Sequence, residues 1–373
     1  MQKTRCHLIL WSRATHLSQL LTGFAELARK GAIELTQELR PSPPPRKESL
    51  AHLRTAHLDH MEVLVDGTRR LYFDTHDSWE LDPQGLERCD FYFKRSFAPA
   101  RIDPAVRHKV LPLGLYYQVY PSGYDKLEAK RAFYYGRGLK GGVKAMALYT
   151  SAALSGRGRR QHTVEALSAP PVLDDDPRAL FMTRVYGPAK DEGGVRNPLN
   201  EPTVVNPMRA ECVLRLREEL GDKFFGGIEH SPYAQQHFEA ALLPDNADSA
   251  RSRYLNLLRK HSIGVTTTGL HGSIGGKLAE YVAFAKAIVT EPLHYEVPGD
   301  FREGRNYLTF TSAAECASQV ARLMHDWELR HSMMQNNWNY YRSFLRPDKL
   351  VRNALTAATP AVADEASRSA TAA

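Results

Sequence analysis

The sequence has few cysteines and no long apolar run, and both absences narrow the class of protein. Among its 373 residues there are four cysteines, Cys6, Cys89, Cys212 and Cys316. They lie far apart, without the spacing of a C-x-x-C motif or of a cysteine–histidine metal site. We therefore expect ordinary buried thiols in a reducing compartment. No stretch approaches the roughly 18 apolar residues of a membrane-spanning helix.

A secretory signal is also missing from the expected place. The apolar run from Leu8 to Trp11 is interrupted at once by Ser12 and Arg13, and it is too short for a signal peptide. We therefore expect a cytoplasmic protein. Lys and Arg exceed Asp and Glu by seven, 49 against 42. This balance favours anionic partners: nucleotide phosphates, nucleic acid or an anionic membrane face.

The length and the alternation of patterns predict two α/β domains. A chain of this size exceeds what one core usually holds. A strand pattern at 7–11, a helical pattern at 17–28 and a strand pattern at 32–35 form a β–α–β opening. Turn formers and acidic residues cluster at 170–177. We accordingly predict domains at 1–170 and 171–345, followed by a segment at 346–373 that ends in a disordered tail.

The second half contains a more specific unit. Asn206-Pro207 has the form of a helix start. Further on, a β-branched strand is expected at 263–267, a glycine-rich turn at 271–276, a helix at 277–286 and a strand at 287–290. Strand, turn, helix and strand within so few residues predict a βαβ unit with parallel strands.

The glycine-rich turn is a candidate phosphate site. A turn between a strand and a helix exposes backbone N–H groups at the positive end of the helix. Its spacing differs from the dinucleotide fingerprint G-x-G-x-x-G, and a turn needed only for packing is the alternative. The residues assigned to the site here are His271, Gly272, Ser273, Gly275, Gly276 and Lys277.

Three segments of the second half resemble a known family. Residues 264–292, GVTTTGLHGSIGGKLAEYVAFAKAIVTEP, are similar to the nucleotide-sugar-binding unit of GT-B-fold glycosyltransferases of the family 1 type. The segment FREGRNYL at 301–308 resembles that family's G-x-N-x-L segment. LFMTR at 180–184 resembles the opening of its C-terminal domain. The resemblance covers about residues 179–345.

The resemblance implies a fold and a reaction. The fold is α/β, with two Rossmann-like domains facing across a cleft. The reaction moves a sugar from a nucleotide-sugar donor to an acceptor hydroxyl, on a glycan or a lipid-linked glycan, with no further cofactor and no metal. Glu280 matches the glutamate that holds the ribose hydroxyls, and Arg184 the basic residue facing the diphosphate, with Lys277 as a second candidate. Gly272 stands where retaining members often have another glutamate, so the stereochemistry stays open.

The acceptor side is expected in the first half. Asp74-Thr-His-Asp77 follows a predicted strand that ends at Phe73, and the carboxyl ends of parallel strands are where open α/β sheets place function. Asp77 or His76 is a candidate general base, and His16, at the first strand–helix turn, is a third. A capping or hydrogen-bonding role in a loop is the alternative for each.

A basic run separates the two halves. Between Lys130 and Val164 there are eight Lys and Arg residues and no acidic one. The run fits a solvated loop, a lid, or a surface that contacts anionic lipid headgroups at the inner membrane face.

Two other functions remain as alternatives. An NAD-dependent oxidoreductase or epimerase needs G-x-G-x-x-G after the first strand, but the residues from Trp11 to His16 include no glycine. A nucleic-acid-binding protein would use the basic run. No known nucleic-acid-binding motif accompanies it, so no nucleic-acid partner is expected.

Overall fold

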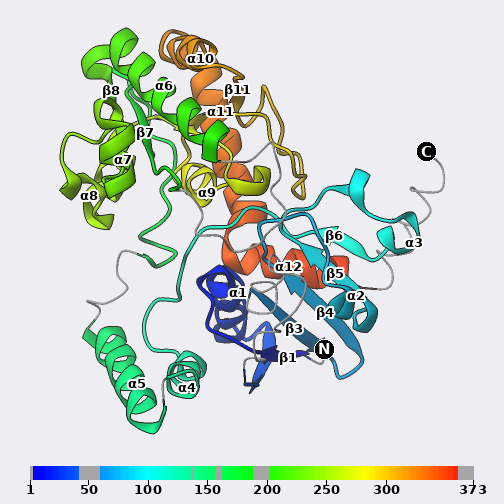
Figure 1. Cartoon of the computed structure of the whole chain (residues 1–373). Helices are drawn as coiled ribbons and strands as arrows, with labels where there is room; N and C mark the ends of the chain where they lie inside the picture. Colours follow the sequence, from blue (N-terminus) through cyan, green and yellow to red (C-terminus); the bar gives the residue numbers. More distant parts are fainter. Residues whose placement is uncertain (1–2, 42–58, 137, 156–161, 188–201, 360–373) are drawn as a thin grey trace. The chain divides into compact units, whose positions relative to one another are not determined.

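The computed structural model describes residues 3–41, 59–136, 138–155, 162–187 and 202–359. The chain divides into two compact units. The first comprises residues 1–166, 296–298 and 343–373, and the second residues 167–295 and 299–342. Each unit has one sheet with helices packed on it (Figure 1). The tail expected to be disordered lies almost entirely outside the described residues.

The sheet of the first unit has six strands in the order β2-β1-β3-β4-β5-β6. β1 and β2 are parallel, as are β4, β5 and β6, whereas β3 is antiparallel to both of its neighbours. The β3–β4 turn consists of Asp66, Gly67 and Thr68, and it connects the paired residues Val65 and Arg69. Asp66 and Gly67 both have positive φ, as is common in hairpin turns. The strands are β1 (Thr4–Leu10), β2 (Ile33–Leu39), β3 (His60–Val65), β4 (Arg69–Asp74), β5 (Phe91–Lys94) and β6 (Val110–Pro112).

The last helix of the chain belongs to the first unit. α12 (Pro347–Ala357) packs against α1 (Ser18–Arg29), and Leu350 and Val351 enter the core around Phe24. The contact is close: a Cβ on Gly23 would lie 2.2 Å from the carbonyl oxygen of Pro347. The other helices of this unit are α2 (Pro83–Arg88), α3 (Pro104–Arg107), α4 (Lys126–Tyr134) and α5 (Gly138–Ser155).

Most of the basic run that the structure describes is helical and lies in α4 and α5, so the interpretation as a loop is wrong for these residues. α5 occupies most of it and packs on α4. Gly142 allows this contact, because a Cβ there would lie 2.5 Å from the carbonyl oxygen of Phe133. The glycine at this position therefore allows close packing of the two helices.

The sheet of the second unit is entirely parallel, in the order β8-β7-β9-β10-β11. Counted within the unit, this is the order 2-1-3-4-5 of a doubly wound, Rossmann-like sheet, which reverses between β7 and β9. The predicted βαβ unit at 263–290 is present. The strands are β7 (Ala179–Thr183), β8 (Phe224–Ile228), β9 (Ile263–Thr266), β10 (Ala287–Thr290) and β11 (Leu308–Thr309).

Two predicted helix ends in the second unit differ from the structure: α9 ends at Ala283 instead of residue 286, and α6 starts earlier than predicted. α6 begins at Pro202, and Pro207 lies inside it, so the predicted start at Asn206-Pro207 is wrong. Asn206 does not cap the helix; its side chain bonds both the N–H and the carbonyl of Tyr186. The helices are α6 (Pro202–Leu220), α7 (Pro232–His237), α8 (Arg251–Lys260), α9 (Gly276–Ala283), α10 (Ala313–His325) and α11 (Trp327–Tyr340), followed by a π-helical turn (Tyr341–Leu345).

Candidate functional site

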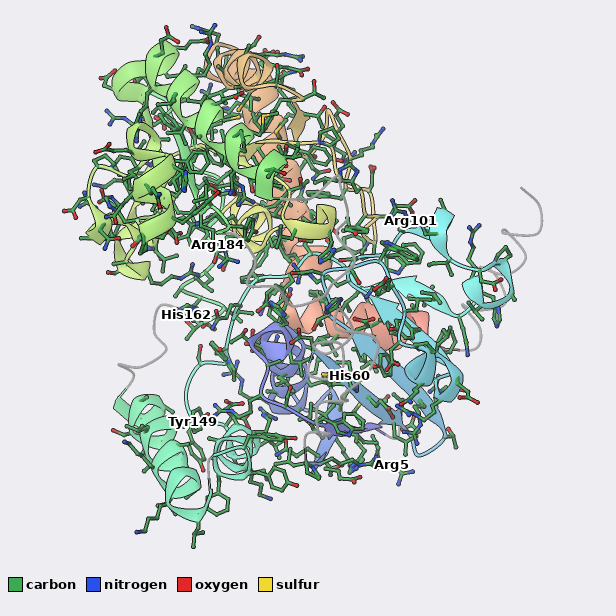
Figure 2. All side chains as sticks on the ribbon, in the orientation of Figure 1. Arg5, His60, Arg101, Tyr149, His162 and Arg184 are labelled. Atoms are coloured by element: carbon green, nitrogen blue, oxygen red, sulfur yellow. The ribbon has the colours of Figure 1, made fainter. Side chains whose placement is uncertain are left out.

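The strand reversal in the second unit places two loops side by side at the carboxyl edge of the sheet. Ligands of open α/β sheets bind at this type of position. Arg184 follows β7 directly and is exposed, with its guanidinium 5.5 Å from the centre of the Tyr186 ring (Figure 2). Thr267 and Thr268 follow β9. The predicted diphosphate-facing residue therefore lies at the topological switch point.

A buried arginine that the sequence did not single out joins these two loops. Arg209, on α6, is 5% exposed. It donates to the carbonyls of Arg184 (2.6 Å) and Thr268 (2.9 Å) and to the hydroxyl of Thr267 (2.9 Å). Burial lowers the pKa of Arg209. Since its donors are engaged with backbone and hydroxyl groups, Arg209 fixes the loops that carry the candidate site.

The glycine-rich turn has the geometry of an open approach to a helix end. His271 and Gly272 have φ of 62° and 66°, and Gly275 is extended before α9 begins at Gly276. A Cβ on Gly275 would meet only the carbonyl oxygen of Thr267, at 4.0 Å. Packing therefore does not require a glycine at 275. The first N–H groups of α9 have no helical carbonyl to bond, as at every helix start.

The first turns of α9 carry the two charged candidates. The Lys277 ammonium lies 4.4 Å from the centre of the Tyr254 ring and 3.9 Å from a Glu229 oxygen. Desolvation lowers the pKa of Lys277, while Glu280 and Glu229 oppose that shift and Arg184 reinforces it. Lys277 thus lies within electrostatic reach of Arg184 and of Glu280.

Glu280 is 8% exposed and pairs with Arg251 of α8, at 2.7 Å. The pKa of Tyr254 is raised, by burial first and then by the charge of Glu280. The structure therefore places Glu280 at a buried position with a charged partner, and not at a solvated position of the helix. Arg251 and Tyr254, which both lie beside Glu280, are further residues that the sequence pattern did not identify.

The remaining predicted residues of this turn contribute backbone geometry. The carbonyl of His271 accepts a hydrogen bond from the Tyr295 hydroxyl at 2.5 Å. Ser273 is buried, and its carbonyl accepts from the N–H of Gly269 at 2.8 Å. Glu291, at the end of β10, accepts from the N–H and the hydroxyl of Thr268 and so orders the β9 loop.

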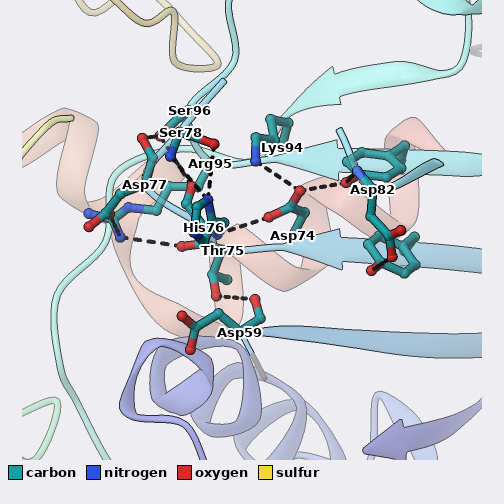
Figure 3. Close-up of polar contacts among 12 residues, drawn as sticks. Asp59, Asp74, Thr75, His76, Asp77, Ser78, Asp82, Lys94, Arg95 and Ser96 are labelled. Atoms are coloured by element: carbon teal, nitrogen blue, oxygen red, sulfur yellow. Dashed lines mark hydrogen bonds and ion pairs between the residues drawn. The ribbon is translucent and has the colours of Figure 1, made fainter. Parts of the chain in front are cut away.

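In the first unit, a buried polar network lies at the carboxyl end of strand β4. Asp74 accepts from the ammonium of the fully buried Lys94 at 2.8 Å and from the Tyr92 hydroxyl (Figure 3). It also accepts from the N–H of His76 at 2.9 Å. A buried carboxylate and ammonium require such pairing. This network fixes the start of the loop that carries His76 and Asp77.

His76 and Asp77 are both engaged within this loop. The Nδ1 atom of His76 accepts from the N–H of Ser78 at 3.2 Å, and burial together with the nearby Lys94 lowers the pKa of His76. Asp77 pairs with Arg95 at 2.6 Å. The Ser96 hydroxyl donates to the carbonyl of Asp77 at 2.7 Å. As a base, Asp77 would first have to leave Arg95.

His16 has a carboxylate partner that the sequence did not predict. Its Nδ1 lies 3.4 Å from an oxygen of Asp59, and its ring meets that of Tyr116 edge to face at 5.3 Å. Asp59 reaches this edge because β3 runs antiparallel, so its amino end lies beside the carboxyl ends of β1 and β4. A hollow of the first unit is lined by His16, Thr75, Arg95 and Tyr116, together with apolar residues.

Two features are absent from the described residues. They contain no group of three or more His, Cys, Asp or Glu side chains placed to hold a metal ion. Within the same ranges, no helix combines the length and apolarity needed to cross a membrane. All four cysteines are buried and unbridged, as predicted.

The predicted fold and the predicted resemblance can both be compared with the structure and with known proteins. The predicted fold class, α/β with two Rossmann-like units, is confirmed. Residues 215–355 match the family model described as "Glycosyl transferase-like". The match contains the glycine-rich turn and α9, but neither β7 nor the first sheet. The resemblance to glycosyltransferases in the C-terminal half of the chain is thereby confirmed.

Solved structures share the architecture only loosely. The C-terminal domain of a group 1 glycosyl transferase (LpcC) from Francisella tularensis is 14% identical, covers 48% of this chain and 95% of its own, and has a TM-score of 0.33. Alr3699/HepE from Anabaena, solved with UDP, is 8% identical over 93% of this chain and 98% of its own, with a TM-score of 0.39. No curated protein matches the chain significantly in sequence.

Proposed function

We propose that this protein transfers a sugar from a nucleoside diphosphate sugar to an acceptor hydroxyl. The observation that supports it best is the set of groups around the glycine-rich turn. Open amides at Gly275 and Gly276, the cations Arg184 and Lys277, and the carboxylate of Glu280 belong to neighbouring elements of one sheet edge. The family match over 215–355 favours glycosyl transfer over the oxidoreductase alternative.

In the proposed donor site, each of these groups binds a different part of the nucleotide-sugar. Amides at a helix start and cations suit a diphosphate, whose negative charge grows as it leaves the sugar. The carboxylate of Glu280 would accept hydrogen bonds from the ribose hydroxyls, and Arg251 would hold that carboxylate in position. In this scheme the protein's own cations neutralise the leaving group without a metal.

For the acceptor, we assign the general base to His16. As the acceptor oxygen bonds to the anomeric carbon and the bond to the diphosphate breaks, the hydroxyl proton passes to Nε2 of His16. Asp59, facing Nδ1, would orient the ring and stabilise its cation. Asp77, held by Arg95, and His76, whose Nδ1 accepts from a backbone N–H, are less free to act. A lipid-linked or free glycan acceptor, used at the inner membrane face, belongs to the same proposal.

The proposal is tested by binding and then by turnover. Calorimetry of the full chain with UDP, GDP, dTDP and CMP compounds should show one of them binding. The matching nucleotide-sugar should then raise the melting temperature, because a ligand of the folded state stabilises it. Release of nucleoside diphosphate in the presence of a glycan acceptor completes the test. No heat with any nucleotide would refute the proposal.

A further inference from the structure

Most of the exposed large apolar side chains described in the first unit lie on helix α5, and the others are Tyr124, Phe133 and Tyr134 on or next to α4. Leu139 and Leu154 are each 74% exposed, Val143 is 49% and Met146 is 37% exposed. Single exposed apolar residues are ordinary on a protein surface, whereas a continuous group indicates an interaction site.

These four side chains form one stripe. Val143, Met146 and Leu154 follow Leu139 by four, seven and fifteen positions, which are spacings that return to one face of a helix. Leu148, 61% exposed, lies on another side of the helix. Tyr149 lies on the side of α5 next to the stripe, and this side packs on α4.

The stripe is not needed for the packing of the two helices. Tyr149 accepts a hydrogen bond from the N–H of Asp125 at 2.8 Å and packs with Ala129 and Ala132 of α4 (Figure 2). The close approach at Gly142 supplies the rest of the contact. α5 is therefore held by one face while the stripe remains open.

The exposed charges around the stripe are of one sign. Lys140 and Lys144 each follow a stripe residue, and Lys126 and Lys130 are exposed on α4. The acidic residues of α4 and its N-cap already have partners within the protein. Asp125 caps α4 and faces Arg131, and the buried Glu128 pairs with Arg13 and Arg131. Among the lysine, aspartate and glutamate side chains of the described residues 126–154, only lysines are exposed.

We propose that the α4–α5 pair binds the surface of an anionic lipid bilayer, with the stripe of Leu139, Val143, Met146 and Leu154 entering the headgroup boundary. Apolar side chains flanked by lysines are the composition of helices that lie in a membrane interface. The lysine stems reach past the stripe to lipid phosphates. A second copy of the chain fits less well, because a symmetric contact would oppose like charges. Binding requires neither donor nor acceptor, so its outcome is independent of the proposed reaction.

The test is sedimentation of the full chain with vesicles. We expect binding to phosphatidylcholine vesicles containing phosphatidylglycerol, weakening with added salt, and little binding to pure phosphatidylcholine. Lys140→Gln with Lys144→Gln should reduce the partition coefficient by about tenfold or more. The matched control is Lys260→Gln with Arg322→Gln, two exposed residues of the second unit, which removes equal charge and should leave binding nearly unchanged.

A second measurement reports on the stripe itself. The four native cysteines are buried, so an environment-sensitive dye can be attached through Leu139→Cys or through the control Leu148→Cys. At 139 the emission should shift to the blue on anionic vesicles and become protected from an aqueous quencher, and at 148 much less so.

Three results would overturn the proposal: no sedimentation with anionic vesicles, equal loss in the charge-matched control, or equal dye responses at both positions. A change of oligomeric state in Leu139→Gln with Leu154→Gln, at unaltered vesicle binding, would assign the stripe to self-association instead.

Discussion

Glu280 and Arg251 form an ion pair of 2.7 Å between α9 and α8, beside the buried Tyr254. The pair holds a carboxylate at low exposure next to the candidate diphosphate groups. The residue assigned to the ribose is therefore already oriented before any nucleotide binds. Preorganisation of this kind reduces the entropy lost on binding.

Glu280→Ala should weaken binding of the nucleoside diphosphate about tenfold or more, because a hydrogen bond to a charged acceptor contributes roughly 1.5–3 kcal/mol. Glu280→Gln retains an acceptor and should lose less. Titration calorimetry measures both, with melting curves to separate the effect of leaving Arg251 without its partner. Glu211→Ala, at an exposed position of α6, is the control. Unchanged affinity in Glu280→Ala would remove this residue from the site.

Arg184 and Arg178 flank the same strand at opposite ends and allow a matched comparison. Arg184→Gln should weaken diphosphate binding roughly tenfold at low salt, and less at high salt, because exposed charges are screened. Arg178→Gln, at the amino end of β7, should have no effect on affinity. Equal losses in the two variants would mean that net charge, and not position, attracts the nucleotide.

Gly275→Ala distinguishes a phosphate-binding turn from a packing turn. A Cβ at 275 has only one neighbour, at 4.0 Å, so the free energy of unfolding should change by less than about 0.5 kcal/mol. Nucleotide binding should nevertheless fall, because the methyl group enters the space of the diphosphate. Gly264→Ala, whose Cβ would lie 2.7 Å from the Tyr281 ring, should instead cost about 1–3 kcal/mol. Full nucleotide affinity in Gly275→Ala would favour the packing turn.

His16→Ala should lower the transfer rate about 100-fold while nucleotide affinity stays constant, because loss of a general base affects turnover. Asp59→Asn should cause a smaller loss of rate, because the histidine is kept and only the carboxylate that orients its ring is lost. His325→Ala, at an exposed position of α10, serves as the control. If Asp77→Asn abolishes transfer and His16→Ala does not, the base is Asp77.

Lys286 gives a pH-dependent prediction. Burial lowers the pKa of Lys286 from 10.5 to about 8. Between those values the unfolded chain binds more protons than the folded one, so the free energy of unfolding rises with pH from about 8 to 10. Lys286→Met should therefore be more stable near pH 7, by up to about 3 kcal/mol, and the advantage should shrink above pH 8. Urea titrations at several pH values measure it, with exposed Lys260→Met as the control. A difference independent of pH would contradict the assignment.

Local patterns in the sequence predict much of the fold. The βαβ unit at 263–290 and the strand before Asp74 agree with the structure because their sequence signals are short-range. The sequence did not predict the α4–α5 helix pair, because glycines are typical of loops. Their role, close contact between Gly142 and Phe133, depends on the partner helix.

The residues of the candidate site also fall into those that the sequence predicts and those that it does not. Arg184, Lys277 and Glu280 stand next to recognisable strand and helix ends, so sequence patterns find them. Arg209 reaches Thr267 across 58 positions, and Arg251 reaches Glu280 from a different helix. Asp59 reaches His16 only because β3 runs against its neighbours. Such pairs depend on strand order and direction, which residue spacing does not encode.

The return of α12 to the first unit has a consequence for the order of folding. Because Leu350 and Val351 complete the core around Phe24, a nascent chain that has emerged as far as residue 166 still lacks part of its own interior. The second unit, in contrast, is complete once the chain has been synthesised as far as residue 342. We therefore expect the later-synthesised unit to mature first on the ribosome, and the earlier one to wait for the final helix.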